Sequence, residues 1–273
     1  MAARDIQAFY QAIQNGDSQK VLSMLEGSPS LLHVPNSDGE WDEISPLHIA
    51  AKYGHLDIVK ELIDRGAEVY SNPIASYPPV ILAAWKDQKE VVDFFLSEIP
   101  EKANGTNGLG VTIHLAARQG WIDQVRKHIE ADPLAVHQRG WLGDTALHWS
   151  SHNGYVEIVE LLLNAGADIE ADEINWIGGK PLHWASEHAP KVVKLLLERG
   201  ANVNARNIKK DSDLFEFTPL IMNASQGDDC SEATELLIAA GADPSLADAN
   251  GKTAMDHAAG QKNNRILSVL KKE

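Results

Sequence analysis

Residues 180–204 read KPLHWASEHAPKVVKLLLERGANVN, and this stretch decides the fold because related versions of it recur along the chain. Two further clear copies open with SPLHIAA at residues 45–51 and with TALHW at residues 145–149. Each copy continues into an apolar run of isoleucine, valine and leucine and closes on Gly-Ala, and the period is about 33 residues. A repeat of this length predicts a stack of small units that bury their apolar faces on their neighbours, without one central core.

The repeat resembles that of the ankyrin repeat family, whose motif reads Thr-Pro-Leu-His and whose unit is a β-turn finger followed by two antiparallel helices. The resemblance covers residues 5–270 and implies an all-α ankyrin-repeat solenoid. We therefore expect a single ankyrin-repeat domain over residues 1–273, built from about eight units. The expected units are an N-terminal cap at 5–36, then 45–77, 78–110, 111–143, 144–179, 180–217 and 218–251, and a C-terminal cap at 252–273.

The composition excludes several classes of function. A hydrophobic share of 44% and a charged share of 23% are typical of a soluble folded protein. No apolar run approaches the roughly 18 residues that a membrane span requires, and Arg4 and Asp5 stand where a signal peptide has its apolar core. A net charge of -15 repels nucleic acid, and the single cysteine, Cys230, excludes an internal disulfide. We expect a cytoplasmic protein that binds no membrane, no nucleic acid, no metal and no cofactor.

Four histidines occupy the motif position, namely His48, His114, His148 and His183. Because they recur at the same place in successive units, they cannot converge on one metal ion or one substrate. The resemblance implies a structural role, in which each imidazole bonds to backbone groups and ties neighbouring fingers together.

Three tryptophans, Trp41, Trp141 and Trp176, each lie seven residues before a motif histidine. They therefore share one place in the repeat, at the tip of the finger. Two interpretations remain open: each ring packs on the next finger, or the rings form an aromatic floor for a partner. Exposed apolar area and the enrichment of tryptophan in binding hot spots favour the second.

The resemblance also implies that finger tips and the exposed positions of the first helices form the binding surface. Trp149 and Trp184 follow motif histidines and are expected to pack between first helices, at the border of this groove. The candidate residues for binding a ligand or partner are Trp41, Tyr53, Trp85, Arg118, Trp141, Trp149, His152, Trp176, Trp184 and His188.

Two functions follow. The first is a non-catalytic scaffold that recognises a protein or peptide through a tryptophan-rich concave groove. The second is an enzyme or binding protein that takes a small anionic or aromatic ligand in the same groove, with His152, Glu187, His188, Arg118 and Asp144 as acid-base candidates. For each of these five residues a solvated surface role competes. No His-Glu-x-x-His, Gly-x-Ser-x-Gly or phosphate-loop motif is present, so the sequence leans against catalysis.

Overall fold

The computed structural model describes residues 3–35, 44–69, 78–98, 112–140, 142–210, 214–227 and 230–271. These ranges contain sixteen α-helices and two short 3-10 helices, and no β-strand occurs within them. The all-α class is therefore confirmed. None of the helices in the described ranges combines the length and the apolar character needed to cross a bilayer.

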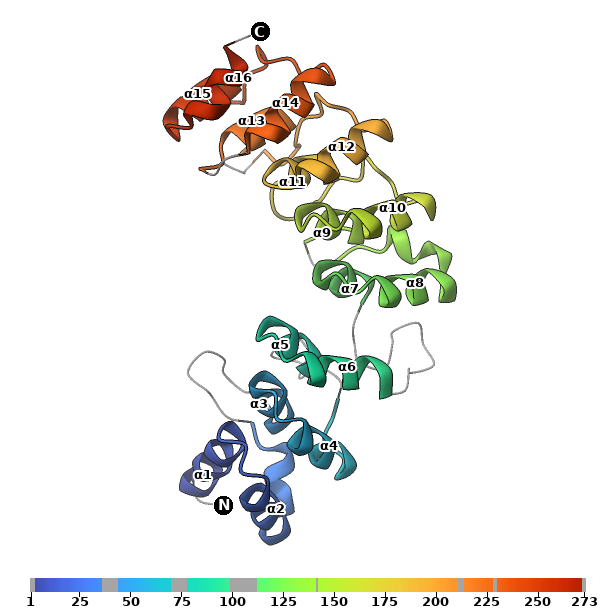
Figure 1. The fold of residues 1–273 in the computed structure, drawn as a ribbon, viewed down its shortest axis with the longest axis vertical. Helices are drawn as coiled ribbons and strands as arrows, with labels where there is room; N and C mark the ends of the chain where they lie inside the picture. Colours follow the sequence, from blue (N-terminus) through green and yellow to red (C-terminus); the bar gives the residue numbers. More distant parts are fainter. Residues whose placement is uncertain are drawn as a thin grey trace. The chain divides into compact units, whose positions relative to one another are not determined.

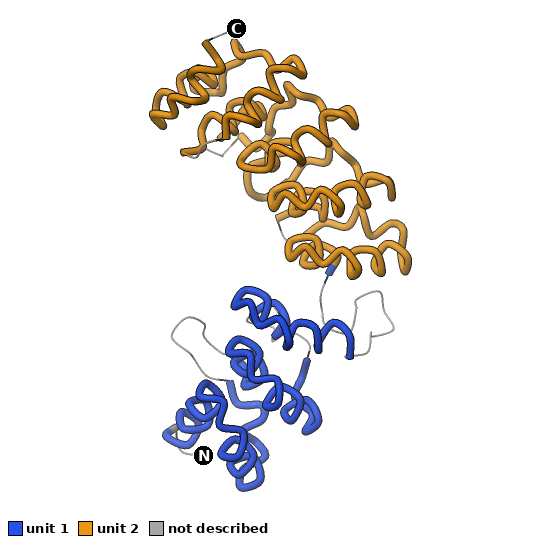
Figure 2. Tube along the Cα trace, in the orientation of Figure 1, with its two compact units in different colours: residues 1–112 blue, residues 113–273 orange. Residues whose placement is uncertain are grey.

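The chain divides into two compact units, residues 1–112 and residues 113–273 (Figure 2). The first unit contains α1 (Ala3–Gln14), α2 (Ser18–Gly27), the 3-10 helix η1 (Pro29–His33), α3 (Pro46–Tyr53), α4 (Leu56–Asp64), α5 (Pro79–Trp85) and α6 (Lys89–Glu98). The second contains α7 (Ile113–Gln119), α8 (Ile122–Ala131), the 3-10 helix η2 (Pro133–His137), α9 (Ala146–His152), α10 (Val156–Asn164), α11 (Pro181–Ser186), α12 (Pro190–Glu198), α13 (Pro219–Ala224), α14 (Ser231–Ala239), α15 (Ala254–Gly260) and α16 (Asn264–Leu270).

The helices form consecutive pairs, and the pairs stack within each unit (Figure 1). In the second unit α7, α9, α11, α13 and α15 pack in series, and α8, α10, α12, α14 and α16 form the second layer. In the first unit α1, α3 and α5 pack in the same way, as do α2, α4 and α6. The eight-unit division of one continuous domain over residues 1–273 stays a prediction.

Helix α12 shows why these sequences form amphipathic helices. Pro190 occupies the first helical turn, where its missing N–H is not needed, and Val192, Val193 and Leu196 are buried along one face. The chain leaves the helix through Gly200, which has a φ of 91° that a residue without Cβ adopts at little cost. The same helical pattern is predicted from the sequence, and the structure confirms it.

Two of the four motif histidines, His148 and His183, join consecutive fingers in the way that the resemblance implies. The Nδ1 atom of His148 accepts a hydrogen bond from the backbone N–H of Thr145 at 3.1 Å, so its Nε2 carries the proton and donates to the carbonyl of Gly179 at 3.1 Å. His183 repeats the arrangement one unit later, with Lys180 N–H and the carbonyl of Phe217. Both rings are fully buried, and each one forms hydrogen bonds with two backbone groups that would otherwise be removed from water without a hydrogen-bond partner.

Replacement of His183 by alanine should destabilise the second unit by about 3 kcal/mol, because it leaves two buried backbone groups unpaired and opens a cavity. Urea unfolding followed by circular dichroism measures the loss. The matched control is His137→Ala, since His137 is exposed. Equal unfolding midpoints for the two variants would show that the inter-finger bond contributes nothing.

Because His148 and His183 are buried, we expect the protein to lose stability in acid. Burial lowers the pKa of His148 to about 3 and that of His183 to about 4, whereas both have the ordinary value of 6.5 in the unfolded chain. The unfolded state therefore binds more protons below pH 6.5, and stability that is complete above this value declines as the pH falls toward about 4. Urea midpoints measured across this range should fall less steeply in His183→Gln than in the unmodified protein.

Candidate functional site

Five aromatic side chains of the second unit form one connected group, which we call the aromatic cluster: Trp149, His152, Trp176, Trp184 and His188. The ring of Trp184 lies at its centre, 5.1 Å from Trp149, 5.9 Å from His152 and 5.5 Å from Trp176 between ring centroids, and all three contacts are T-shaped. His188 extends the group through His152 at 4.6 Å. Edge-to-face contacts of this kind add to the energy of burial and fix the orientation of the rings.

Trp184 differs from its expected place at the border of a groove. Its exposed fraction is 1%, so it lies beneath the surface and supports the other rings without being accessible itself. Its Nε1 atom is buried and has no hydrogen-bond partner within the described part of the chain. The sequence places this tryptophan between first helices correctly, but only packing against α9 decides that the ring is covered.

Trp149 is fixed on both sides. Its Nε1–H donates a hydrogen bond of 2.6 Å to the carboxylate of Asp144, which is buried, and the guanidinium of Arg118 lies 4.4 Å from the centre of its ring. A cation over an indole face is attracted by the electron density of the ring. Arg118 and Asp144, two of the predicted acid-base candidates, are thereby brought to opposite parts of one tryptophan.

His152, Glu187 and His188 meet where α9 and the turn between α11 and α12 lie side by side. The Nδ1 atom of His152 lies 3.6 Å from Oε2 of Glu187, beyond hydrogen-bond distance, and Nδ1 is buried without a hydrogen-bond partner among the described residues. Burial, followed by the charges of His188 and Arg118, lowers the pKa of His152 to about 4, and burial raises the pKa of Glu187 to about 7. At neutral pH this arrangement holds a neutral imidazole beside a carboxyl group that readily exchanges a proton.

The turn that contains Glu187 and His188 is shorter than the corresponding turn of the preceding helix pair. The second helix starts eight positions after the motif histidine in α9–α10, from His148 to Val156, but only seven positions after His183, at Pro190. In the α9–α10 turn Gly154 has a φ of 75°, whereas no residue between Ser186 and Pro190 has a positive φ. The turn after α11 is therefore built without the left-handed residue that the turn after α9 contains.

The finger before α11 is organised by a buried carboxylate. Glu173 is 0% exposed, and its side chain accepts hydrogen bonds from the backbone N–H groups of Trp176, Ile177 and Gly178. These bonds close the loop and leave Trp176 48% exposed at its tip. Of the three finger tryptophans, Trp176 is therefore partly exposed and also packed, while Trp41 and Trp141 lie outside the described residues.

Two exposed isoleucines on consecutive fingers escape the sequence analysis. Ile174 is 57% exposed and Ile208 is 55% exposed. The N–H of Ile174 donates to the carbonyl of Leu142, and that of Ile208 donates to the carbonyl of Gly178, so each isoleucine rests on the preceding finger. Their spacing of one repeat is the signal that an analysis of all apolar finger residues would detect.

The predicted residues of the first unit lie at the ends of first helices. Tyr53 ends α3, is 42% exposed and stacks on His55 with ring centroids 6.4 Å apart. Trp85 ends α5 and is half-buried. Both positions agree with the expected first-helix register.

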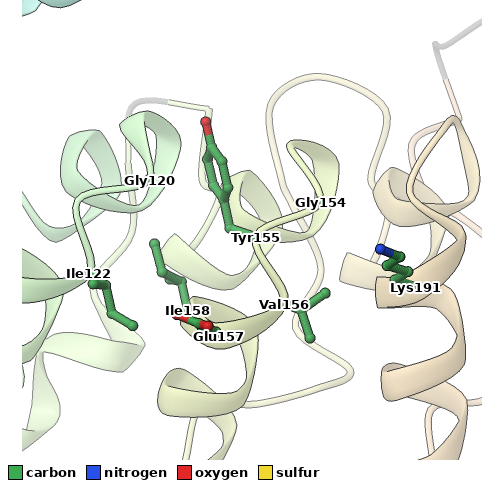
Figure 3. Close-up of a pocket in the computed structure, with 8 residues that line it drawn as sticks. All are labelled: Gly120, Ile122, Gly154, Tyr155, Val156, Glu157, Ile158 and Lys191. Atoms are coloured by element: carbon green, nitrogen blue, oxygen red, sulfur yellow. The ribbon is translucent and has the colours of Figure 1, made fainter.

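A pocket of about 330 Å³ lies beside the turn that joins α7 to α8 and the turn that joins α9 to α10 (Figure 3). Its lining comes from Gly120, Ile122, Gly154, Tyr155, Val156, Glu157, Ile158 and Lys191. The ring of Tyr155 covers Gly120, but the equivalent residue before α12 is the small Ala189, which leaves space beside Gly154. None of the predicted site residues lines this pocket.

Replacement of Glu187 by glutamine should stabilise the protein above pH 7 by about 2 kcal/mol and have little effect near pH 4.5. The measurement is made in a buffer with EDTA, so that no metal ion contributes to stability. The pKa of this carboxyl rises from 4.5 in the unfolded chain to about 7 in the folded one, so its contribution to stability falls as the pH rises between these values. Urea unfolding at both pH values measures the difference. The control is Glu198→Gln, at a side chain that is 61% exposed. An effect of Glu187→Gln that does not change with pH would contradict the raised pKa of Glu187.

Comparison with known proteins agrees with this architecture. The family model described as ankyrin repeats in three copies matches residues 9–106 and 113–207. Similar proteins include ankyrin repeat protein nuc-2 of Neurospora crassa, 27% identical over 99% of this chain and 24% of its own length, and the B-cell lymphoma 3 protein homolog of Mus musculus, 26% identical over 84% of this chain and 50% of its own. Ankyrin repeat and KH domain-containing protein mask-1 of Caenorhabditis elegans is 30% identical over 85% of this chain and 7% of its own length. The chain thus spans half or less of these relatives, and the repeats, the helix pairs and the family match together show that it belongs to the ankyrin repeat family.

Proposed function

We propose that this chain is a non-catalytic scaffold that binds a protein or peptide, with its recognition surface on the finger tips and first helices of the second unit. Ankyrin repeats generally mediate protein–protein interaction, which supports this class of function. The observation that carries the proposal is the exposure of three large apolar side chains, Ile174, Trp176 and Ile208, on two consecutive fingers. Exposed apolar area of this kind marks an interaction surface in a soluble protein.

The fingers are rigid enough to act as a preformed surface. Glu173 closes one finger with three backbone hydrogen bonds, and Asn207 closes the next by bonding Leu214 and Phe217. Trp176 is held by its contact with buried Trp184. Because these groups are ordered before a partner arrives, binding costs little additional conformational entropy.

The chemistry of this surface favours a partner that has an apolar segment flanked by acidic residues. Trp176 and the two isoleucines offer apolar contact, while Arg118 and Lys209 add positive charge at the neighbouring first helix and finger, in a chain whose net charge is -15. The Nζ atom of Lys209 bonds the carbonyl of Asn175, beside Trp176. Such a combination of aromatic anchor and cation is typical of binding hot spots.

A catalytic function is the second candidate, supported by the neutral His152 beside Glu187. Proton transfer would require a substrate held against these two groups. The 330 Å³ pocket is lined by other residues, so the scaffold explains more of the observed surface.

Replacement of Trp176 by alanine should weaken partner binding by roughly 30-fold, which corresponds to about 2 kcal/mol for the loss of a hot-spot tryptophan. Peptides selected from a displayed library on the unmodified chain would be measured by calorimetry against the variant. The control is Leu134→Ala, which removes a side chain that is 70% exposed on η2. Selected peptides that bind both variants equally would place recognition elsewhere.

A further inference from the structure

Among the described residues, His152, Glu187 and His188 form a group whose side chains each offer one metal-ligating atom, and these three atoms lie within 4.8 Å of one another. We infer that they bind one divalent transition-metal ion of the zinc class. This inference goes beyond partner binding, and it differs from the expectation, drawn from the sequence, that the chain binds no metal. The ligands come from the end of α9 and from the turn that follows α11.

The donor set is the first support. Two imidazoles and one glutamate form a known three-ligand set for zinc, in which the fourth position stays open to water. Ligand atoms around a tetrahedral zinc ion lie about 3.3 Å apart when each bond is about 2.0–2.1 Å long. Small side-chain rotations would therefore bring the three ligand atoms, which lie within 4.8 Å of one another, to the separations found around a zinc ion. His188 is exposed and has space to rotate.

The unsatisfied atom at the centre of the group is the second support. Nδ1 of His152 is buried and has no hydrogen-bond partner in the described structure, although Oε2 of Glu187 lies 3.6 Å away. A buried polar atom without a partner costs free energy, and an ion bound to Nδ1 of His152 would remove this cost.

Charge favours a cation over an anion at this place. Nδ1 of His152 is buried and has no hydrogen-bond partner among the described residues, so no hydrogen bond from them competes with a metal for this nitrogen. The carboxylate of Glu187 would repel an anion and would offset part of the charge of a metal ion. The guanidinium of Arg118 opposes a cation, but it lies over the ring of Trp149, with buried Asp144 bonded to the same indole.

The ring contacts show how the group is held in position. His152 packs edge-to-face against Trp149 and Trp184, which limits the rotation of the imidazole. The turn before Ala189 is anchored by the Sγ–H of Cys230, which donates to the carbonyl of Glu187 at 2.7 Å, and by Asn223, whose side chain donates to the carbonyl of Ser186 at 2.9 Å. Two of the three ligands are thus presented by a supported backbone, as a metal site requires.

The experiment uses the full chain, treated with EDTA and desalted, and titrates it with Zn²⁺ at neutral pH in a calorimeter. We expect one tight equivalent per chain. His188→Ala and Glu187→Gln should each weaken it by at least about tenfold, since even outer-shell changes cost 10–100-fold in metal affinity. His137→Ala, at an exposed histidine of the same unit, should bind as the unmodified chain does. Co²⁺, added as a coloured substitute, should give absorption bands of a low-coordinate site that disappear in His188→Ala.

Circular dichroism checks that each variant is folded, and His188→Gln, which preserves the size and polarity of an exposed side chain, decides the outcome if Glu187→Gln unfolds. Equal Zn²⁺ affinity in the unmodified chain and in the His188 variants would overturn the inference, as would the absence of a tight equivalent. The titration contains no partner, so its result is independent of whether the proposed recognition surface binds a peptide.

Discussion

The hydrogen bonds of the motif histidines are the interaction on which the rest of the second unit depends. A finger is an irregular loop whose backbone groups must find partners when neighbouring fingers cover them. His148 and His183 supply those partners on two fingers at once, because one ring nitrogen accepts from the start of the histidine's own helix and the other donates to the next finger. Burial keeps both rings neutral, which this pattern of one donor and one acceptor requires.

The aromatic cluster is built on the scaffold that these bonds create. His148 packs its ring against Trp184 at 5.3 Å, and Trp184 in turn contacts Trp149, His152 and Trp176. The buried indole of Trp184 therefore contacts both His148, which joins the fingers, and three residues of the aromatic cluster. A change in the register of the fingers would move Trp176 and His152 together, because both are oriented by the same ring.

The sequence predicts many of the residues that form the site, but it does not predict how deeply each of them is buried. The repeat period predicts that Arg118, Trp149, His152 and His188 lie near one another, and the structure brings them together, with His188 in the turn after α11. The period does not reveal that Trp184 is covered while Trp176 remains exposed, since both follow from how a particular finger closes around Glu173. The exposure of Ile174 and Ile208 does not follow from the positions of the tryptophans, because it depends on how the two fingers lie on the fingers before them.

The sequence by itself determined the family, the helix pairs and the role of the motif histidines, because a repeated local pattern specifies the same local structure wherever it occurs. Only the tertiary structure decided what lies at the turn after α11, which is one residue shorter than the turn after α9: Glu187 and His188 lie beside His152, and the small Ala189 lies beside Gly154. Distances between side chains on neighbouring units depend on the packing of those units, and no single repeat contains that information.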